Sequence, residues 1–585
     1  MKKNAVFGTQ RSPSFMKKNK ADKNLQKKRY HNIKEMLDTV CWEHAQDPAF
    51  FYKQNSKYRP ITYSRLRSDI RSLGAALLHR GLGGKKILLI GENSYAWCLT
   101  YLTALCGLGI IIPVDKETPA EDLCDIAKIS GAGAIIYSKK YEQKADALPK
   151  KLQKISFEEL FTLCDQAMTF SDKELHDFDL LSIDIDSTAA LIFTSGTTGI
   201  SKGVMISQRN ICFTLEGLSC AIPEDTTGVS LAILPFHYIY ESIAGLLFPL
   251  SCGKAVAFSD GVRSTMQNAK EIAPTNIICV PSMVEKMYRK IWANIKKHGT
   301  EEKVNKLIKA SNSIKIPALK IKAKKKLFAE IHAAFGGELQ YFMVSGGSID
   351  PEVVTGMKDF GFNIVRAYGL AECTSFVTIT PYLDQNNNSD GKALWSSELK
   401  IVDPDAQGIG EIYYRGDNVM LGYYKHDELN KEIKQNGWIQ TGDMGTIDTD
   451  GNLCVLGRKK NAIHTSQGKF VFPEELEPML TRSPYVKECA VIGLKLDSKK
   501  HADITAVVFP DYIYSREILG VYSSRPMVRE KLTAAINELN SHLPSHKRIT
   551  RLVLLDEEIP KNSYKKVIRQ TLPEYVIREY IELGR

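Results

Sequence analysis

Short apolar runs alternate with amphipathic stretches along most of the chain. Four early runs have the length and composition of buried strands: 86–91, 110–114, 134–138 and 189–193. Helical spacing occupies the stretches 63–80, 94–108 and 120–130. In 63–80, Leu66, Ile70, Leu73, Ala76 and Leu77 fall on one side. Strands that alternate with helices in this way predict a parallel sheet covered by helices, and hence an α/β fold.

The same alternation continues in the middle of the chain. Further strands are predicted at 230–234, 276–280, 340–344 and 363–367, and a helix at 208–221. Pro281 is expected to open a helix, followed by long Lys-rich helices over 286–326. After strand 453–456, the pattern predicts strands 486–493, 504–509 and 553–555 around a helix at 527–543.

Composition places the chain among soluble globular enzymes. It has 585 residues, 43% hydrophobic and 25% charged, which is enough for two or more domains. The longest apolar stretch, 231–258, carries His237, Glu241 and Lys254, which excludes a transmembrane helix. The N-terminus lacks the apolar core of a signal peptide. The twelve cysteines show no Cys-x-x-Cys pair, so we expect reduced thiols and a cytoplasmic location.

The net charge of +11 is concentrated in two segments. Residues 1–29 hold ten Lys/Arg and one Asp, and we expect them to form a disordered basic tail. Residues 286–326 hold fourteen Lys/Arg and two Glu. One hypothesis is peripheral association with anionic lipid on the inner membrane face, or attraction to coenzyme phosphates; the alternative is a set of solvated helix faces. Interleaved aromatics and nucleic-acid motifs are missing, so no nucleic-acid partner is expected.

The strand at 189–193 runs into a loop suited to a polyphosphate. Its glycines allow backbone N–H groups to approach an anion, its hydroxyls are neutral donors, and its lysine adds a charge. The candidate residues are Thr194, Ser195, Gly196, Thr197, Thr198, Gly199 and Lys202. The spacing is not that of a Walker A loop, which disfavours a P-loop ATPase or GTPase. The alternative is an ordinary Ser/Gly surface turn.

The run Thr-Ser-Gly-Thr-Thr-Gly-x-x-Lys-Gly resembles the phosphate loop of the adenylate-forming (AMP-binding) enzyme superfamily. That superfamily includes acyl-CoA synthetases, luciferases and the adenylation domains of peptide synthetases. The chain departs from the family at Ser201, where Pro is usual. Further family landmarks follow in order between residues 30 and 575. The basic segment 286–326 makes the chain most similar to bacterial long-chain fatty acyl-CoA synthetases.

The resemblance implies a site for the nucleotide. Gly346 and Gly347 would lie against adenine, Tyr368 would stack on it, and Gly369 follows in the same motif. Glu372 would hold Mg²⁺ together with phosphates and water. The family usually has Thr at the position of Ala371, where the hydroxyl faces the α-phosphate; Thr374 or a water are the candidate replacements.

Further roles are implied toward the end of the chain. Asp443 and Arg458 match ribose-binding positions, and Lys460 matches the domain hinge. Gln467-Gly468-Lys469 would face the channel of the thiol. In the run 560–569, spacing assigns the catalytic lysine to Lys566, and Lys565 replaces the usual Gly.

The acyl side of the site is less defined by the motifs. His237 matches a family position between the nucleotide and the acyl pocket, with a plain core histidine as the alternative. The apolar run 243–248 either lines a long tunnel or forms a core helix.

The resemblance implies a large N-terminal multi-sheet α/β domain, 30–458, and a small mobile C-terminal α+β lid, 459–585. The expected activity is ATP-dependent activation of a carboxylic acid through acyl-AMP, with Mg²⁺, and transfer to coenzyme A. A medium- or long-chain fatty acid is favoured, while an aryl acid or an acyl carrier protein as acceptor stays open. A non-catalytic nucleotide-binding homologue is the alternative from another class, supported by Ser201, Ala371 and Lys565.

Overall fold

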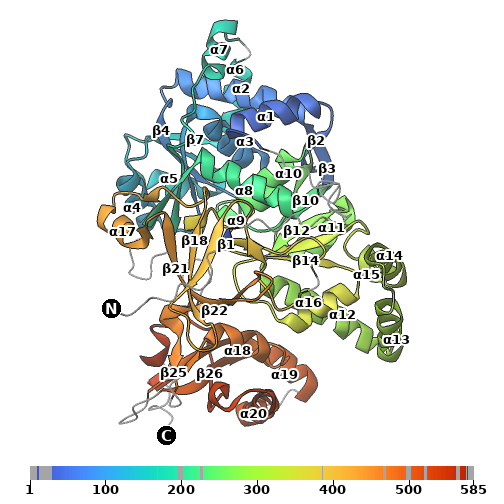
Figure 1. The fold of residues 1–585 in the computed structure, drawn as a ribbon. Helices are drawn as coiled ribbons and strands as arrows, with labels where there is room; N and C mark the ends of the chain where they lie inside the picture. The colour runs from blue at the N-terminus through green and yellow to red at the C-terminus, as the bar shows by residue number, and fades with distance from the viewer. Residues whose placement is uncertain are drawn as a thin grey trace.

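The protein is described by a computed structural model for residues 10–11, 29–167, 169–194, 202–223, 228–384, 386–465, 469–495, 502–519, 524–561, 567–574 and 576–577. Several sheets and their helices form a large N-terminal region, and a smaller region of strands and helices lies below it in Figure 1. The predicted α/β class, with a large multi-sheet N-terminal domain and a smaller C-terminal α+β domain, is confirmed.

One sheet contains the strand that leads into the phosphate loop. In the described residues its order is β19-β9-β8-β5-β4-β6-β7. Its strands are β4 (Lys85–Ile90), β5 (Gly109–Val114), β6 (Ala134–Tyr137), β7 (Gln153–Ser156), β8 (Thr188–Thr194), β9 (Lys202–Ser207) and β19 (Gly422–Tyr423). The pairs among β4 to β8 are parallel, whereas β9 and β19 add antiparallel pairs. The four apolar runs predicted as strands are β4, β5, β6 and β8.

A second sheet has the order β16-β15-β14-β13-β12-β10-β11-β2-β3 in the described residues. Its strands are β2 (Pro48–Gln54), β3 (Lys57–Thr62), β10 (Val229–Ala232), β11 (Ala255–Phe258), β12 (Asn276–Cys279), β13 (Tyr341–Val344), β14 (Asn363–Tyr368), β15 (Thr378–Ile379) and β16 (Lys392–Ala393). The five strands from β11 to β14 in this order run parallel. Their carboxyl ends therefore meet at one edge, where ligands bind in open α/β sheets.

Helices cover these sheets (Figure 1). In the first half they are α1 (Ile33–Glu43), α2 (Tyr63–His79), α3 (Tyr95–Thr103), α4 (Ala120–Ser130), α5 (Glu142–Asp146), α6 (Phe157–Ala167), α7 (Asp172–Asp179), α8 (Gln208–Ala221), α9 (Ile239–Glu241), α10 (Phe248–Ser251) and α11 (Thr265–Ile272). α2 begins where the Thr62 side chain accepts a hydrogen bond from the Arg65 N–H. Its predicted apolar face is buried.

Gly107 explains why the helix predicted over 94–108 is interrupted. The stretch 94–108 was predicted as one helix, but α3 ends at Thr103 and a π-helical segment, η3 (Ala104–Leu108), follows. Gly107 has φ +106° inside that segment, a conformation that other residues rarely adopt. The backbone therefore leaves the α-helix before the strand β5 begins.

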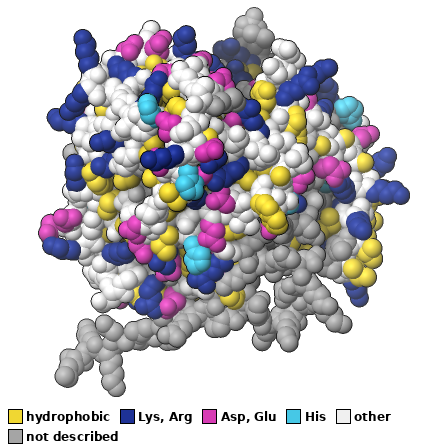
Figure 2. All heavy atoms as spheres, turned by 90° about the horizontal axis from the view of Figure 1, so that it is seen from above, with side chains coloured by type: hydrophobic (Ala, Val, Ile, Leu, Met, Phe, Trp, Pro, Cys, Tyr) yellow, Lys and Arg dark blue, Asp and Glu magenta, His cyan; other side chains and the backbone are white. Residues whose placement is uncertain are grey.

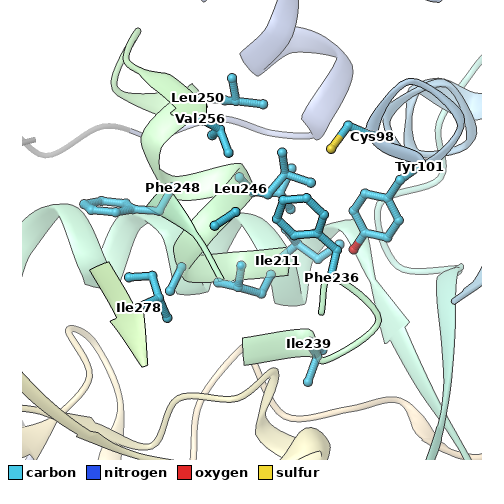
Figure 3. Close-up of a cluster of buried hydrophobic side chains, with 14 of the residues drawn as sticks. Cys98, Tyr101, Ile211, Phe236, Ile239, Leu246, Phe248, Leu250, Val256 and Ile278 are labelled. Atoms are coloured by element: carbon cyan, nitrogen blue, oxygen red, sulfur yellow. The ribbon is translucent and has the colours of Figure 1, made fainter. Parts of the chain in front are cut away.

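A cluster of apolar side chains fills the space around the run 243–248 (Figure 3). The run forms the π-helical segment η6 (Ser242–Leu247) and the start of α10, and all of its residues are buried. In Figure 3, Leu246 and Phe248 lie among side chains from α3, α8 and the sheet, including Cys98, Ile211 and Ile278. Of the two alternatives for this run, the structure shows the core helix.

The basic segment forms the predicted Lys-rich helices. They are α12 (Pro281–Lys297), α13 (Glu301–Asn312) and α14 (Pro317–Leu327), followed by α15 (Ala329–Ala333) and α16 (Pro351–Asp359). Figure 1 shows α13 and α14 projecting at one side of the molecule. Pro281 stands at the start of α12, as its sequence predicts.

An antiparallel sheet follows in the chain. It contains β17 (Glu398–Val402), β18 (Gly410–Arg415), β20 (Lys434–Gln435), β21 (Trp438–Ile447) and β22 (Leu453–Arg458), with α17 (Asp427–Ile433) beside it. Two residues of the N-terminal tail, β1 (Gln10–Arg11), pair with β17. This departs from the expected disorder of 1–29 at those two positions, because the open edge of β17 offers backbone partners.

The described residues after Lys459 build apolar clusters of their own. Their elements are β23 (Ile463–His464), β24 (Phe470–Val471), α18 (Pro473–Leu480), β25 (Val486–Leu494), β26 (Asp503–Pro510), α19 (Tyr512–Leu519), α20 (Arg525–His542) and β27 (Arg551–Leu554). The three predicted strands and the helix of this region are present as β25, β26, β27 and α20. No helix in the described ranges has both the length and the apolar character needed to cross a bilayer.

Candidate active site

The carboxyl ends of β13 and β14 bring two predicted motifs together. Val344 and Arg366 are register partners on these strands. Gly346 and Tyr368 each lie two residues further along, so both stand at the same edge of the sheet. Gly346 adopts φ +91°, which favours glycine, and it lies beside Val280 at the start of α12. The two glycines predicted to contact adenine, Gly346 and Gly347, thus follow the strand next to the one that ends in Tyr368.

His237 lies between the carboxyl edge of this sheet and that of the sheet that contains β5 and β8. On β5 and β8, Ile111 pairs with Ala190, so Asp115 and Thr194 occupy equivalent positions at the carboxyl ends. The His237 Nε2 atom lies 3.5 Å from the Asp115 Oδ2 atom, and both side chains are buried. Burial acts to raise the pKa of Asp115, but the His237 imidazole, the Glu117 N–H and the Lys116 charge together outweigh it, and the pKa lies below its usual value. The carboxyl edges of the two sheets therefore face each other across His237 and Asp115.

The predicted phosphate loop connects two antiparallel strands. Thr194 at the end of β8 is the register partner of Lys202 at the start of β9. The Thr194 hydroxyl donates a hydrogen bond to the Lys202 carbonyl over 3.5 Å. Ser195, Gly196, Thr197, Thr198 and Gly199 lie outside the described residues, as does Ser201. A strand-loop-strand unit agrees with the exclusion of a Walker A loop, which opens a helix.

Lys202 and Glu372 both contact Tyr423. The Lys202 ammonium lies 5.5 Å from the centre of the Tyr423 ring. The Tyr423 hydroxyl donates a 2.7 Å hydrogen bond to Glu372 Oε1. Glu372 belongs to the short helix η8 (Ala371–Cys373), and Tyr423 to β19. The predicted phosphate-binding lysine and metal-binding carboxylate therefore occupy one small cluster.

Asn418 fixes the backbone that presents Glu372. Its side-chain amide donates to the carbonyls of Cys373 and Phe376, at 2.9 and 2.5 Å. This holds Thr374 and Ser375 in the left-handed region, at φ +48° and +70°. The Thr374 hydroxyl donates to the Asn418 carbonyl over 2.8 Å and is fully buried. Thr374 therefore does not replace the hydroxyl that Ala371 lacks.

Tyr368, Asp443 and Arg458 form a second cluster. Asp443 on β21 and Arg458 on β22 are directly opposite one another. The Arg458 Nε atom lies 2.9 Å from Asp443 Oδ1, and the Tyr368 hydroxyl donates to Asp443 Oδ2 over 2.6 Å. Burial raises the pKa of Asp443, and Arg458 offsets part of that effect. Asp443 thus joins the other two predicted nucleotide-binding side chains, Tyr368 and Arg458.

Gly369 keeps the two clusters close together. A Cβ at this position would lie 1.9 Å from the Ser375 carbonyl oxygen, which is shorter than any stable contact. Only glycine allows Tyr368 and the Glu372 loop to pack backbone against backbone here. The negative charge of Glu372 also raises the pKa values of Asp443 and Arg458. The two clusters are therefore close enough for their charges to interact.

Lys460 lies directly after β22, in the short helix η9 (Lys459–Asn461). Partial burial and the neighbouring Arg458 lower its pKa. The next residue, Asn461, donates a 2.6 Å hydrogen bond to Glu474 of α18. Gln467, Gly468 and Lys566 lie outside the described residues. Near the end of the chain, Arg569 pairs with Glu477 of α18 at 2.5 Å.

One ion-pair cluster crosses between the C-terminal region and the large domain. Arg482, after α18, contacts both oxygens of Asp350 at 2.5 and 2.8 Å, and Glu352 at 2.7 Å. Asp350 is 2% exposed and also accepts the Glu352 N–H, so it caps α16. We refer to the contact of Arg482 with Asp350 and Glu352 as the Arg482 latch. On the same side, Arg289 of α12 donates to the Thr481 carbonyl.

The chain shares its sequence features with one known family over most of its length. The profile of the AMP-binding enzyme family matches residues 37–424, and that of the AMP-binding enzyme C-terminal domain matches residues 460–578. The chain belongs to the AMP-binding enzyme family. The predicted resemblance to adenylate-forming enzymes is therefore confirmed.

Curated relatives of this AMP-binding enzyme include two long-chain-fatty-acid–CoA ligases. The Escherichia coli protein is 26% identical over 93% of this chain and 94% of its own length. Ligase 5 of Rattus norvegicus is 26% identical over 79% of this chain and 72% of its own length. Among solved structures, the anthranilate CoA ligase in complex with anthranoyl-AMP has a TM-score of 0.73 and 18% sequence identity. The match covers 94% of this chain and 97% of the ligase. The Bacillus subtilis O-succinylbenzoate CoA synthetase in complex with ATP and magnesium has a TM-score of 0.67 and 20% sequence identity. The match covers 92% of this chain and 98% of the synthetase.

The described residues of this AMP-binding enzyme would suit a magnesium ion that takes few protein ligands and is held mainly by phosphate and water oxygens. In the described part of the chain, no group of three or more His, Cys, Asp or Glu side chains could hold a metal. Mg²⁺ typically takes one or two carboxylates and completes its shell with phosphates and water. Glu372, with Tyr423 on one oxygen, matches that donor set.

Sequence reasoning missed two polar side chains of this site, Asp115 and Tyr423. Asp115 directly follows a predicted buried strand, and a carboxylate at the carboxyl end of a parallel strand is a recognisable signal. Tyr423 belongs to the run Gly422-Tyr423-Tyr424, which carries no charged side chain to mark it as part of a site. Its contact with Glu372 depends on the pairing of β19 with β9, which local sequence does not reveal.

Proposed function

We propose that this AMP-binding enzyme activates a medium- or long-chain fatty acid with ATP and transfers the acyl group to coenzyme A. The observation that carries the proposal is the contact of Tyr368, Asp443 and Arg458 beside the cluster of Glu372, Tyr423 and Lys202. One cluster suits a nucleoside and the other suits phosphates and a metal. The fatty-acid CoA ligases among the relatives support the acyl class and the acceptor.

In the first step, an oxygen of the acid's carboxylate attacks the α-phosphorus of ATP. The bond from the α-phosphorus to the bridging oxygen breaks, giving acyl-AMP and pyrophosphate. Asp443 and Arg458 would orient the ribose, with adenine between Tyr368 and the Gly346-Gly347 turn. Residues 194–199 and Lys202 would bind the leaving pyrophosphate, and Lys566 would neutralise charge at the α-phosphate. Glu372 would hold Mg²⁺, which supplies positive charge to the phosphate oxygens.

In the second step, the thiol sulfur of coenzyme A attacks the acyl carbonyl carbon. The bond from this carbon to the AMP oxygen breaks, AMP leaves, and the thiol proton passes to solvent. We propose that residues 459–585 act as a lid that turns about Lys460 between the steps, withdrawing Lys566 and admitting the thiol past Gln467 and Gly468. His237, beside Asp115, would border the acyl group.

Pyrophosphate release from Mg-ATP with a panel of carboxylic acids tests this function. We expect release with acids of one chain-length class, increased by coenzyme A. Release with aryl acids alone would instead favour an aryl acid as the substrate, as in the anthranilate CoA ligase. Release that does not respond to coenzyme A would point to an acyl carrier protein as acceptor. No release from protein that still binds ATP would contradict the proposal and favour a non-catalytic nucleotide-binding homologue.

The Arg482 latch predicts a change in the balance of the two half-reactions. Replacing Arg482 by alanine removes contacts to Asp350 and Glu352 that hold the lid in its present orientation. Arg482 is half exposed, so we discount the interaction to about 1 kcal/mol, which corresponds to roughly fivefold. We expect the ratio of the adenylation rate to the thioester-forming rate to shift by about that factor, in single-turnover measurements of each step.

Arg525→Ala is the matched control, because Arg525 pairs with Asp556 within the lid at 2.6 Å. It should leave the ratio unchanged. An unchanged ratio in Arg482→Ala, or an equal change in both variants, would contradict a latch between the domains.

A further inference from the structure

The surface of α12, α13 and α14 carries charge of almost one sign. Fourteen Lys/Arg and two Glu lie between residues 286 and 326. The exposed lysines are Lys286, Lys290, Lys296, Lys297, Lys303, Lys306, Lys309, Lys315, Lys322 and Lys326. Both acids, Glu301 and Glu302, stand in the first turn of α13, where they offset the positive end of that helix.

Among the described residues, none of these exposed lysines forms an ion pair with an acidic side chain within 4 Å. The ion pairs recorded here involve Lys324 with Asp359 and Lys325 with Glu338, both at 3.3 Å. The face shown in Figure 2 differs from this surface in its charge, because basic and acidic side chains are interspersed on it. On α2 and at its C-cap, at the top of Figure 1, Arg67, Arg71 and Arg80 form ion pairs with Asp38, Asp179 and Glu159 at 2.6 to 2.7 Å. The unpaired charge on α13 and α14 is thus a local property of these helices.

Aliphatic side chains stand exposed among these lysines at both ends of α14, and Leu327, the last residue of the helix, is 42% exposed. Ile316 is 57% exposed and Leu319 is 53% exposed, three residues apart at the beginning of α14. Lys315 and Lys320 flank them in the sequence. Their exposure places them on the outer side of α14, whose buried side includes Lys324 at 3% exposed, while the neighbouring helix α13 packs its own apolar residues (Val304, Leu307 and Ile308) against the core.

We propose that the outer surface of α13 and the start of α14 binds an anionic lipid bilayer. Ile316 and Leu319 would enter the headgroup region, while Lys303, Lys306 and Lys309 bind lipid phosphates. Aliphatic side chains between lysines combine the two attractions that hold proteins at such an interface. A single-stranded nucleic acid would call for exposed aromatic rings, but Tyr288 and Trp292 of α12 pack against Phe360. The inference does not depend on the proposed enzymatic function.

Flotation of the full-length protein with vesicles tests the charge. We expect binding to vesicles of phosphatidylcholine and phosphatidylglycerol (3:1), but not to phosphatidylcholine alone. Replacing Lys303, Lys306 and Lys309 by glutamine should lower the partition coefficient about 100-fold, because each lysine near an anionic surface contributes roughly fivefold. The control is Lys128, Lys150 and Lys151 changed to glutamine, which removes three exposed lysines elsewhere and should have a much smaller effect.

A second pair of variants tests the aliphatic contact. We expect Ile316→Ser with Leu319→Ser to weaken binding at least tenfold at high salt, where charge attraction is screened. Leu180→Ser with Ile513→Ser, at sites 67% and 75% exposed, is the matched control and should not change binding.

Equal binding to both kinds of vesicle, or equal losses in the patch and control variants, would overturn the proposal. If the Lys303 triple variant lost binding to a DNA duplex but kept vesicle binding, the surface would be assigned to nucleic acid instead.

Discussion

Replacing Lys566 by alanine is expected to lower the rate of acyl-adenylate formation by about 100-fold to 1000-fold. Losses of this size are typical when one group that stabilises developing charge is removed. Negative charge gathers on the α-phosphate while the carboxylate attacks it, and both partners of that step are anions. A lysine between them would reduce their repulsion and act mainly in the transition state. Pyrophosphate release in a single turnover measures this loss.

The same variant should form the thioester from supplied acyl-AMP at close to the normal rate, since Lys566 would have left the site by then. Lys565→Ala is the matched control, because it removes the neighbouring lysine and should spare both steps. Equal loss of the two half-reactions in Lys566→Ala would refute the proposed role. Retained ATP binding would show that the lid and the nucleotide site are still folded.

Replacing Glu372 by glutamine is expected to raise the Mg²⁺ concentration needed for half-maximal adenylation by about tenfold to a hundredfold. The amide keeps the shape and the Tyr423 hydrogen bond but removes the charge that a hard cation requires. A Mg²⁺ titration at saturating ATP measures the shift.

Tyr423→Phe separates the charge of Glu372 from its orientation. This variant keeps the carboxylate and loses only the 2.7 Å bond to Oε1, so we expect a smaller shift, of about threefold. A normal Mg²⁺ titration for Glu372→Gln would count against a metal-binding role, and a larger effect of Tyr423→Phe would assign the effect to positioning.

The regular elements could be predicted because their signals are local. Helices α4 and α8 begin and end at the predicted residues, and for α8 the Ser207 side chain caps the first turn. The runs that form β4, β5, β6 and β8 are apolar because both faces of a parallel sheet are covered. The break after Thr103 was not predicted, since it depends on how Gly107 turns the chain toward β5.

The site was predicted as a set of motifs rather than as an arrangement. Sequence named Tyr368, Asp443 and Arg458 separately, but their contact arises from strand register between β21 and β22 and from packing against β14. The suggestion that Thr374 supplies the missing hydroxyl fails because Asn418 binds the loop from its inner side. Such a partner, 44 residues away in sequence, carries no local signal.

The double role of Asp350 bears on how quickly the lid would dock again if it turns away as proposed. Its carboxylate accepts the Glu352 N–H as the cap of α16, and that bond belongs to the large domain alone. The acceptor for Arg482 would therefore be preorganised before such a lid docks. Only the arginine must give up rotamer freedom on docking, at about 0.5–1.5 kcal/mol for one immobilised side chain. In that motion the conformational search would be confined to the arginine side chain, because its acceptor is already held in place.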